Sequence, residues 1–322
     1  MSTSNDRPPE NFQPVSLSRE KFSRVSFFPI LFILACLSVF AILPNFASGQ
    51  GQYGASRGTS EAVSVSAKEE KQQAINRIPL TELDPAWRTR VLDVAARAAL
   101  FRRMSSQMIE CEPEFYRFLV EHPEVVVAMW QALGVTKLKL QIVGPQKYRL
   151  NDGAGTTAVV EYLYSSPNQH VVYSEGSYSG PLMLRPVEGR VLVVLTSNYL
   201  REATGTPYVS AQMDLFIQVD RAGIELITKA LHPLLGGMAE TNYQQTMAFV
   251  GSVYRTAVVR PQSLERLASQ LTQLEGNTQQ DFLNWIARIG NDSGTTYDRA
   301  AMITPPDGIH ERALQPESTI RQ

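Results

Sequence analysis

The sequence predicts an α+β fold: a curved antiparallel sheet of about six or seven strands packed against a long C-terminal helix, with N-terminal helices and disordered termini. Three observations predict this fold. Apolar residues recur at helical spacing before Gly134, alternate with period two up to Val219, and return to helical spacing beyond Asp220. A sheet with one apolar face must be covered, and the last long helix is the element available to cover it.

Length and charge limit the class of protein. The chain has 322 residues, which is enough for one or two folded domains with tails. Its formal net charge of -1 gives no broad basic surface, so we expect no nucleic-acid partner. Because Cys36 lies in an apolar run, Cys111 is the single thiol of the remainder. One thiol makes neither an intramolecular disulfide nor a cysteine-based zinc site.

The N-terminal region predicts export. Residues 1–25 are polar, and we expect them to be disordered and cytoplasmic. The apolar run Ser26–Leu43 follows, and Arg19, Lys21 and Arg24 precede it. Positive residues stay on the cytoplasmic side of such a run, so the residues after it are translocated. We therefore expect an extracytoplasmic protein, whether secreted, periplasmic or held by a single N-terminal segment.

Residues 26–49 have two alternative fates. The small residues Ala47 and Gly49 fit a signal-peptidase site, which predicts a cleaved signal peptide. The run is also long enough to span a bilayer, which predicts a retained anchor. If the segment stays uncleaved, the membrane is a partner of the protein through Ser26–Leu43.

Composition divides the rest of the chain into three parts. Residues 50–74 have too little apolar surface to offset ordering entropy and read as a flexible linker. Residues 75–290 carry the periodic patterns and form a single α+β domain. Residues 291–322 contain several helix breakers and read as a disordered tail.

Three helices are predicted before the sheet. The first begins at Pro85 after the capping residue Asp84, and its apolar stripe extends to Phe101. The second begins at Pro113. The third begins at Pro123 and ends before Gly134, because glycine readily adopts the left-handed conformation that terminates helices.

Period-two alternation predicts the strands of the sheet. The longest is Tyr208–Val219, where one row of side chains is apolar and the other is largely polar, which predicts one buried and one wet face. Glu188-Gly189 reads as a hairpin turn. The other predicted strands are Lys137–Val143, Tyr148–Leu150, Thr157–Tyr164, His170–Tyr178, Leu182–Arg185 and Arg190–Tyr199.

Helical spacing returns in the last part of the domain. A helix over Ala222–His232 is interrupted by Pro233, and a longer one covers about Met238–Ala257. Two shorter helices follow, over Gln262–Leu274 and Gln279–Ile289.

This element order resembles the START-like (helix-grip, SRPBCC) superfamily over about Glu114–Ala257. The segment Tyr208–Thr256, a long final strand followed by a proline-broken helix, is similar to that superfamily's ending. The chain departs from the pattern in having no clear strand before its first helices. The resemblance implies a hydrophobic cavity between sheet and helix that takes lipids or other apolar ligands, and it implies no catalytic residue.

The candidate ligand-binding residues are apolar or aromatic side chains on the elements that would enclose this cavity. They are Phe115, Trp130, Tyr162, Met213, Leu215 and Met247. The expected partner is a lipid or other apolar small molecule. The pattern indicates no catalytic residue, metal site or cofactor.

Three functions are compatible with the sequence. The first is a non-enzymatic binding module for an apolar ligand. The second is a structural or interaction protein of the cell envelope with a solid core. The third is a cyclase- or hydrolase-type enzyme in the same cavity, which would need a polar pair such as Glu161 with Tyr173, or Asp214 with His170. Alternation places both acids opposite the apolar rows, which disfavours the enzyme.

Overall fold

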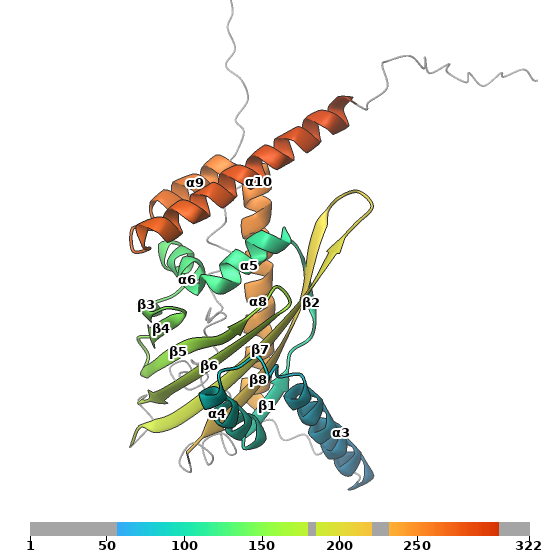
Figure 1. Ribbon diagram of the computed structural model, residues 1–322, viewed down its shortest axis with the longest axis vertical. Coiled ribbons are helices and arrows are strands. Elements are labelled where there is room, and N and C mark those ends of the chain that lie inside the picture. The colour runs from blue at the N-terminus through green and yellow to red at the C-terminus, as the bar shows by residue number, and fades with distance from the viewer. Residues whose placement is uncertain (1–56, 180–184, 221–231, 303–322) are drawn as a thin grey trace, which may run out of the picture.

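The computed structural model describes residues 57–179, 185–220 and 232–302 (Figure 1). Its centre is an antiparallel sheet of eight strands in the order β1-β8-β7-β6-β5-β4-β3, with β2 also paired to β8. The strands are β1 (Leu100–Arg103), β2 (Gln107–Glu110), β3 (Lys139–Gly144), β4 (Lys147–Asn151), β5 (Thr156–Ser165), β6 (Gln169–Tyr178), β7 (Val187–Arg201) and β8 (Pro207–Val219). The curved antiparallel sheet covered by a C-terminal helix confirms the predicted fold class.

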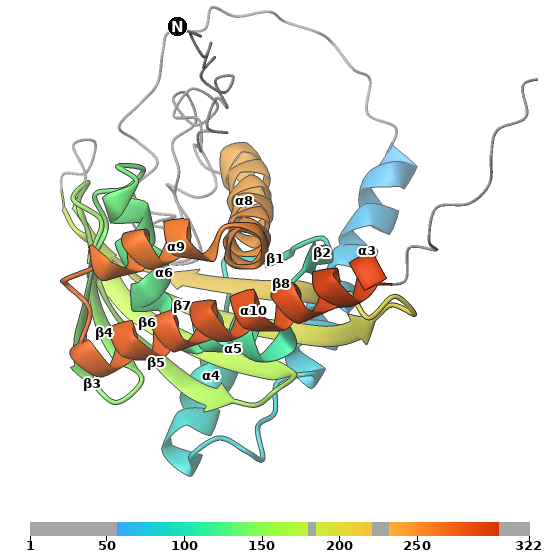
Figure 2. The ribbon, with the colours of Figure 1, turned by 90° about the horizontal axis from the view of Figure 1, so that it is seen from above.

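Helices cover both faces of the sheet. Five of them lie on the face that we call inner: α5 (Pro113–Glu121), α6 (Pro123–Ala132), α8 (His232–Val259), α9 (Pro261–Ser269) and α10 (Gly276–Met302). Figure 2 shows α8, α9 and α10 from above, on this side. The apolar row of β8 faces them, because Val209, Met213 and Ile217 belong to the same buried cluster as Met247 of α8.

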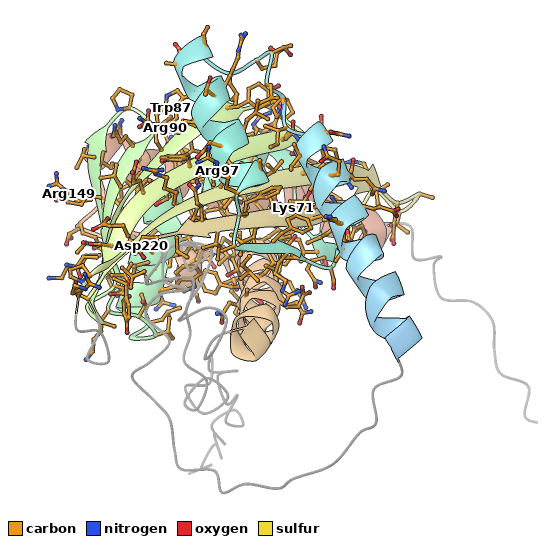
Figure 3. All side chains as sticks on the ribbon, turned by 90° about the horizontal axis from the view of Figure 1, so that it is seen from below. Lys71, Trp87, Arg90, Arg97, Arg149 and Asp220 are labelled. Atoms are coloured by element: carbon orange, nitrogen blue, oxygen red, sulfur yellow. The ribbon has the colours of Figure 1, made fainter. Side chains whose placement is uncertain are left out.

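The opposite, outer face is also covered, which corrects the prediction of a wet face on β8. Helix α4 (Pro85–Ala96) and the residues after α3 (Arg57–Asn76) lie across it (Figure 3). Phe216 and Leu192 are fully buried beneath α4, together with Val91 of that helix. Alternation misassigned this face because its row on β8 is mostly polar, with Phe216 as the apolar exception.

The first helix is shorter than its apolar stripe suggested. Asp84 caps α4, accepting a hydrogen bond from the Ala86 amide at 2.8 Å, as predicted. The helix ends at Ala96, however, and Phe101 lies in β1, where it pairs with Phe216 of β8. The chain therefore does have strands before α5. Pattern reading missed β1 and β2 because four-residue strands are too short to display a period.

Two turn predictions have different outcomes. Gly134 has φ +71 just after α6, as predicted for a helix-terminating glycine. Glu188-Gly189 is not a hairpin turn, because both residues lie inside β7: Glu188 pairs with β6, and Gly189 pairs with both β6 and β8. The predicted strand Leu182–Arg185 falls mainly on residues 180–184, which lie outside the described part of the chain.

The ends of the domain also differ from the prediction. Helix α3 occupies most of the residues predicted as a flexible linker, and the Lys71 ammonium at its end donates to the Ala96 carbonyl oxygen at 3.0 Å. Helix α10 is one long element that packs on the domain through the buried side chains Phe282 and Ile286 and extends to Met302, within the predicted tail. Among the described residues no helix is both long and apolar enough to cross a membrane. The run Ser26–Leu43 lies outside them.

Candidate functional site

A cavity lies between the inner face of the sheet and the helices α5, α6 and α8. Its volume is about 70 Å³, counted as the space that the centre of a water-sized sphere can reach. On the same measure one water molecule needs roughly 10–15 Å³. Its wall is mostly aliphatic and aromatic. The lining residues are Tyr116, Leu119, Val120, Pro123, Val126, Trp130, Val160, Tyr162, His170, Val172, Ser174, Val191, Val193, Leu195, Met213, Tyr243, Met247 and Val250.

Four of the six predicted ligand-binding residues line this cavity, and two do not. Those in the wall are Trp130, Tyr162, Met213 and Met247. Leu215 is buried in the same cluster but is not part of the wall. Phe115 is not in the wall, and its ring lies against the aromatic rings of Tyr254 on α8 and Phe282 on α10.

Helix α5 explains the misplacement of Phe115, because it carries aromatic residues on two sides. Phe115 and Phe118 stack against Phe282 of α10, at centroid distances of 6.4 and 6.3 Å. Tyr116 and Val120, one turn apart, face the cavity. The apolar side of this nine-residue helix is one wide arc, so the spacing alone does not show which margin faces the cavity and which faces α10.

The tyrosine hydroxyls of the wall are already hydrogen bonded within the protein. Those of Tyr162 and Tyr243 donate to the backbone carbonyl oxygens of Val120 and Ala211, at 2.7 and 2.6 Å. The Tyr116 hydroxyl lies 3.1 Å from a serine hydroxyl of β7. Burial raises the pKa of all three phenols well above the ordinary value. These groups are therefore neutral and internally bonded, and they leave the cavity apolar in character.

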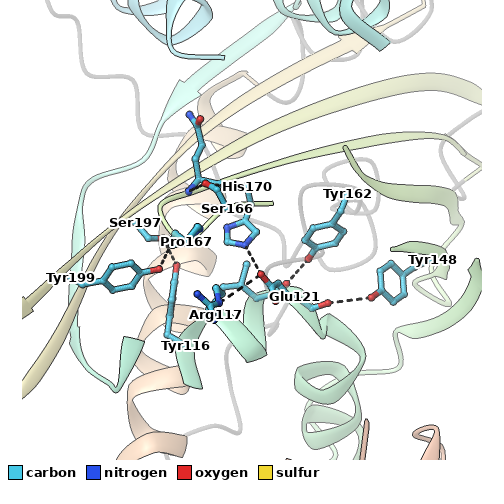
Figure 4. A network of polar contacts seen from close by, with 12 residues as sticks. Tyr116, Arg117, Glu121, Tyr148, Tyr162, Ser166, Pro167, His170, Ser197 and Tyr199 are labelled. Atoms are coloured by element: carbon cyan, nitrogen blue, oxygen red, sulfur yellow. Dashed lines mark hydrogen bonds and ion pairs between the residues drawn. The ribbon is translucent and has the colours of Figure 1, made fainter. Parts of the chain in front are cut away.

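His170 is a polar residue of the wall that was not among the six predicted ligand-binding residues. It is fully buried, and within the described part of the chain neither ring nitrogen has a hydrogen-bond partner. Its Nε2 lies 3.5 Å from the Glu121 Oε1, and the Arg117 Nε lies 4.0 Å from the same oxygen (Figure 4). Burial lowers the pKa of His170, although the Glu121 carboxylate acts in the opposite direction. The ring is therefore neutral at neutral pH.

Alternation along β6 was the signal that could have identified His170. His170, Val172 and Ser174 are spaced by two residues and all line the cavity. The residues between them face the outer layer, where the Tyr173 ring lies 5.0 Å from that of Trp87.

The polar pairs considered for an enzyme do not meet in the cavity. The Asp214 carboxylate is on the outer face, with its Oδ1 2.7 Å from the Arg103 Nε. Glu161 also points away from the inner face and binds Lys147 at 2.8 Å. Neither acid is in the wall, and among the described residues no cluster of His, Cys, Asp or Glu could hold a metal ion.

Comparison with known proteins gives matches to solved structures only. No protein-family model matches the chain, and no curated protein matches it. A conserved protein from Geobacillus kaustophilus is 12% identical, with 48% of this chain and 93% of that one covered, at a TM-score of 0.35. Norcoclaurine synthase from Thalictrum flavum is 12% identical, with coverages of 48% and 88%, at a TM-score of 0.24.

A third match is the di-domain ARO/CYC BexL from the BE-7585A biosynthetic pathway. It is 16% identical, with 61% of this chain and 59% of that one covered, at a TM-score of 0.27. Helix-grip folds are among the matched structures. With TM-scores this low, the functional argument for this chain depends on its own cavity.

Proposed function

We propose that this chain is a non-enzymatic binding module that holds an apolar small molecule between its curved sheet and helix α8. The observation that carries the proposal is the cavity, whose wall is apolar and whose tyrosine hydroxyls are bonded to the protein itself. Sites for apolar ligands have this composition: a mostly hydrophobic wall with a few polar groups.

The volume of the cavity favours a ligand over a purely structural role. Unfilled apolar space lowers the stability of a fold by roughly 24 cal/mol per Å³. For a cavity of about 70 Å³ this is about 1.7 kcal/mol, a notable fraction of a typical domain's stability. A ligand that fills the space recovers this free energy, whereas a structural protein gains nothing from keeping it.

A cavity-filling substitution tests the proposal. Val193 lies in the wall on β7, and Val193→Phe places a larger side chain in the cavity. The matched control is Val143→Phe, since Val143 is also on a strand but is 39% exposed. We expect titration with the apolar fluorophore N-phenyl-1-naphthylamine to show binding by the original chain and the control, weakened about tenfold or more in Val193→Phe.

Two results would contradict the binding function. One is equal binding by all three proteins, which would place the fluorophore elsewhere. The other is the absence of saturable binding together with no co-purified apolar molecule in native mass spectra. That second result would favour the structural alternative.

The proposal extends to location: the domain acts outside the cytoplasm, either free or tethered. The support is the apolar run Ser26–Leu43 with Arg19, Lys21 and Arg24 before it. Sequencing the N-terminus of the chain from its host tests the two fates. A start near Gln50 rules out the anchor, and an intact Met1 rules out the cleaved signal peptide. A protein that fractionates with the cytosol rules out both.

A further inference from the structure

Within the cavity, His170 is the polar side chain whose hydrogen-bonding capacity the protein leaves unused. Its side chain is completely buried. Nε2 has only the Glu121 carboxylate, at 3.5 Å, and Nδ1 has no hydrogen-bond partner in the described part of the chain. A buried polar group without a partner is costly, and most such groups are satisfied by the protein, by water or by a ligand. The tyrosine hydroxyls of the same wall, by contrast, are all partnered.

The neighbouring carboxylate determines which nitrogen carries the hydrogen. Glu121 Oε1 lies 3.5 Å from His170 Nε2, and an ionised carboxylate only accepts hydrogen bonds. The neutral ring is therefore most stable with its hydrogen on Nε2, directed toward Glu121. Nδ1 then carries the lone pair and acts as a hydrogen-bond acceptor.

Glu121 is itself held in place from outside the cavity. The Arg117 Nε lies 4.0 Å from the same Oε1, one turn earlier on α5 (Figure 4). The two side chains are partly exposed, at 38% and 31%, whereas His170 is buried. This partly exposed pair weakly favours the carboxylate position beside Nε2, and the 3.5 Å approach of Glu121 itself sets the tautomer that His170 presents to the cavity.

We propose that the ligand of this cavity carries a neutral hydroxyl group, as in a phenol or an alcohol, and donates its hydrogen to His170 Nδ1. This inference rests on the proposed binding function. An anionic head group is disfavoured, because it offers no donor and would lie close to the Glu121 carboxylate. A pure hydrocarbon would leave Nδ1 unpaired. Neither nitrogen is exposed to solvent in the structure, so binding includes a small rotation of the His170 ring that turns Nδ1 toward the ligand.

A pair of ligands of the same shape tests the proposal. p-Cresol and p-xylene differ by a hydroxyl in place of a methyl group. Their dissociation constants are measured by calorimetry for the full chain and for His170→Phe, in the same membrane-mimetic preparation. The heat measured with the cavity-filled Val193→Phe protein gives the partitioning of each ligand into the lipid, and this background is subtracted. We expect His170→Phe to weaken p-cresol at least about fivefold relative to p-xylene, because the buried hydroxyl loses its acceptor.

Tyr173→Phe is the matched control for this comparison. Tyr173 is also on β6 and also loses a polar atom, but it faces the outer layer, and its hydroxyl donates to the Glu175 carboxylate at 3.0 Å. We expect it to leave the ratio of the two dissociation constants within about twofold of the original chain. An equal change of the ratio in both variants would overturn the assignment to His170.

The remaining outcomes separate this inference from the proposed function. If both ligands bind to the cavity and His170→Phe does not change the ratio of their dissociation constants, the hydroxyl proposal is wrong and the binding function stands. If neither ligand binds above the Val193→Phe background, both are wrong.

A second measurement applies even if His170→Phe does not fold. Long-range ¹H–¹⁵N correlation spectra of the original chain distinguish the two imidazole tautomers directly. We expect the buried His170 to carry its hydrogen on Nε2, with the Nδ1 resonance moving on addition of p-cresol and not of p-xylene. A hydrogen on Nδ1, or an equal response to both ligands, would overturn the proposal.

Discussion

Removal of the Asp214 carboxylate should destabilise the domain by about 3 kcal/mol. Arg103 and Asp214 form a two-pronged pair, with contacts of 2.7 and 3.0 Å, and their side chains are only 11% and 5% exposed. Breaking a buried pair costs about 3–5 kcal/mol, because the remaining charge is left desolvated and unpaired. Because Arg103 is slightly exposed, the cost of Asp214→Ala should lie at the lower end of this range. For a domain of this size the melting temperature should fall by roughly 6–12 °C.

A second cross-strand pair provides the control. Arg190 and Glu175 also join neighbouring strands through an Arg Nε at 3.0 Å, but both side chains are almost half exposed. Glu175→Ala should therefore cost less than about 1 kcal/mol. Urea unfolding followed by circular dichroism measures the free energy of unfolding of both variants. The two values can be compared if the dependence of this free energy on urea concentration is unchanged. Equal losses would refute the reasoning, and so would a failure of Arg103→Leu/Asp214→Leu to recover most of the stability lost by Asp214→Ala.

Two further predictions concern stability. Burial lowers the pKa of His170 from 6.5, so this residue stabilises the fold above pH 6.5 and the contribution is lost on acidification. The hydrogen bond to Glu124 raises the pKa of His122, so the contribution of His122 is present below pH 6.5 and is lost as the pH rises. Urea unfolding at about pH 5 and about pH 8 tests both residues. His170→Gln should lessen the loss of stability in acid, and His122→Gln should lower the free energy of unfolding more at about pH 5 than at about pH 8. A change in stability that is the same at both pH values would refute this. Gly176→Val should cost about 3 kcal/mol or more, because its Cβ would fall 2.7 Å from the Ala158 Cα, whereas Gly144→Ala, whose nearest contact is 3.7 Å away, should have little effect in the same assay.

Local signals of the sequence predicted the elements whose ends are determined by their own residues. Asp84 followed by Pro85 predicted the start of α4, and Gly134 predicted the end of α6. The alternation in Tyr208–Val219 predicted β8, because that strand is long and its inner row is uniformly apolar. These features need no knowledge of the rest of the fold.

Elements that depend on distant partners were not predictable in this way. β1 and β2 are strands because β8 offers them an edge, and their own four residues carry no period. The buried outer face of β8 depends on α4 packing over Phe216. Gly189 is part of a strand and not of a turn because β6 and β8 pair with it on both sides.

The site shows the same limit. Residue type and periodicity identify side chains that face inward, but they do not separate those that meet other side chains from those that meet open space. Phe115 and Leu215 are buried against other side chains and are not part of the wall, whereas Tyr116 lines the cavity. The position of His170 beside Glu121 joins β6 to α5 across 49 residues of sequence, a proximity that only the fold creates.

Under the proposed binding function, the two faces of the sheet should respond differently to substitution. The outer face is closely packed beneath α4, where Leu192 and Phe216 are both completely buried and the Arg103–Asp214 pair joins β1 to β8. The inner face carries the larger buried cluster, and the open space is confined to the cavity within it. Substitutions of similar volume at wall positions such as Met213 should therefore change which ligand fits at modest cost in stability. Substitutions at outer positions such as Leu192 should destabilise the fold without altering ligand preference, and this asymmetry is what a binding module requires.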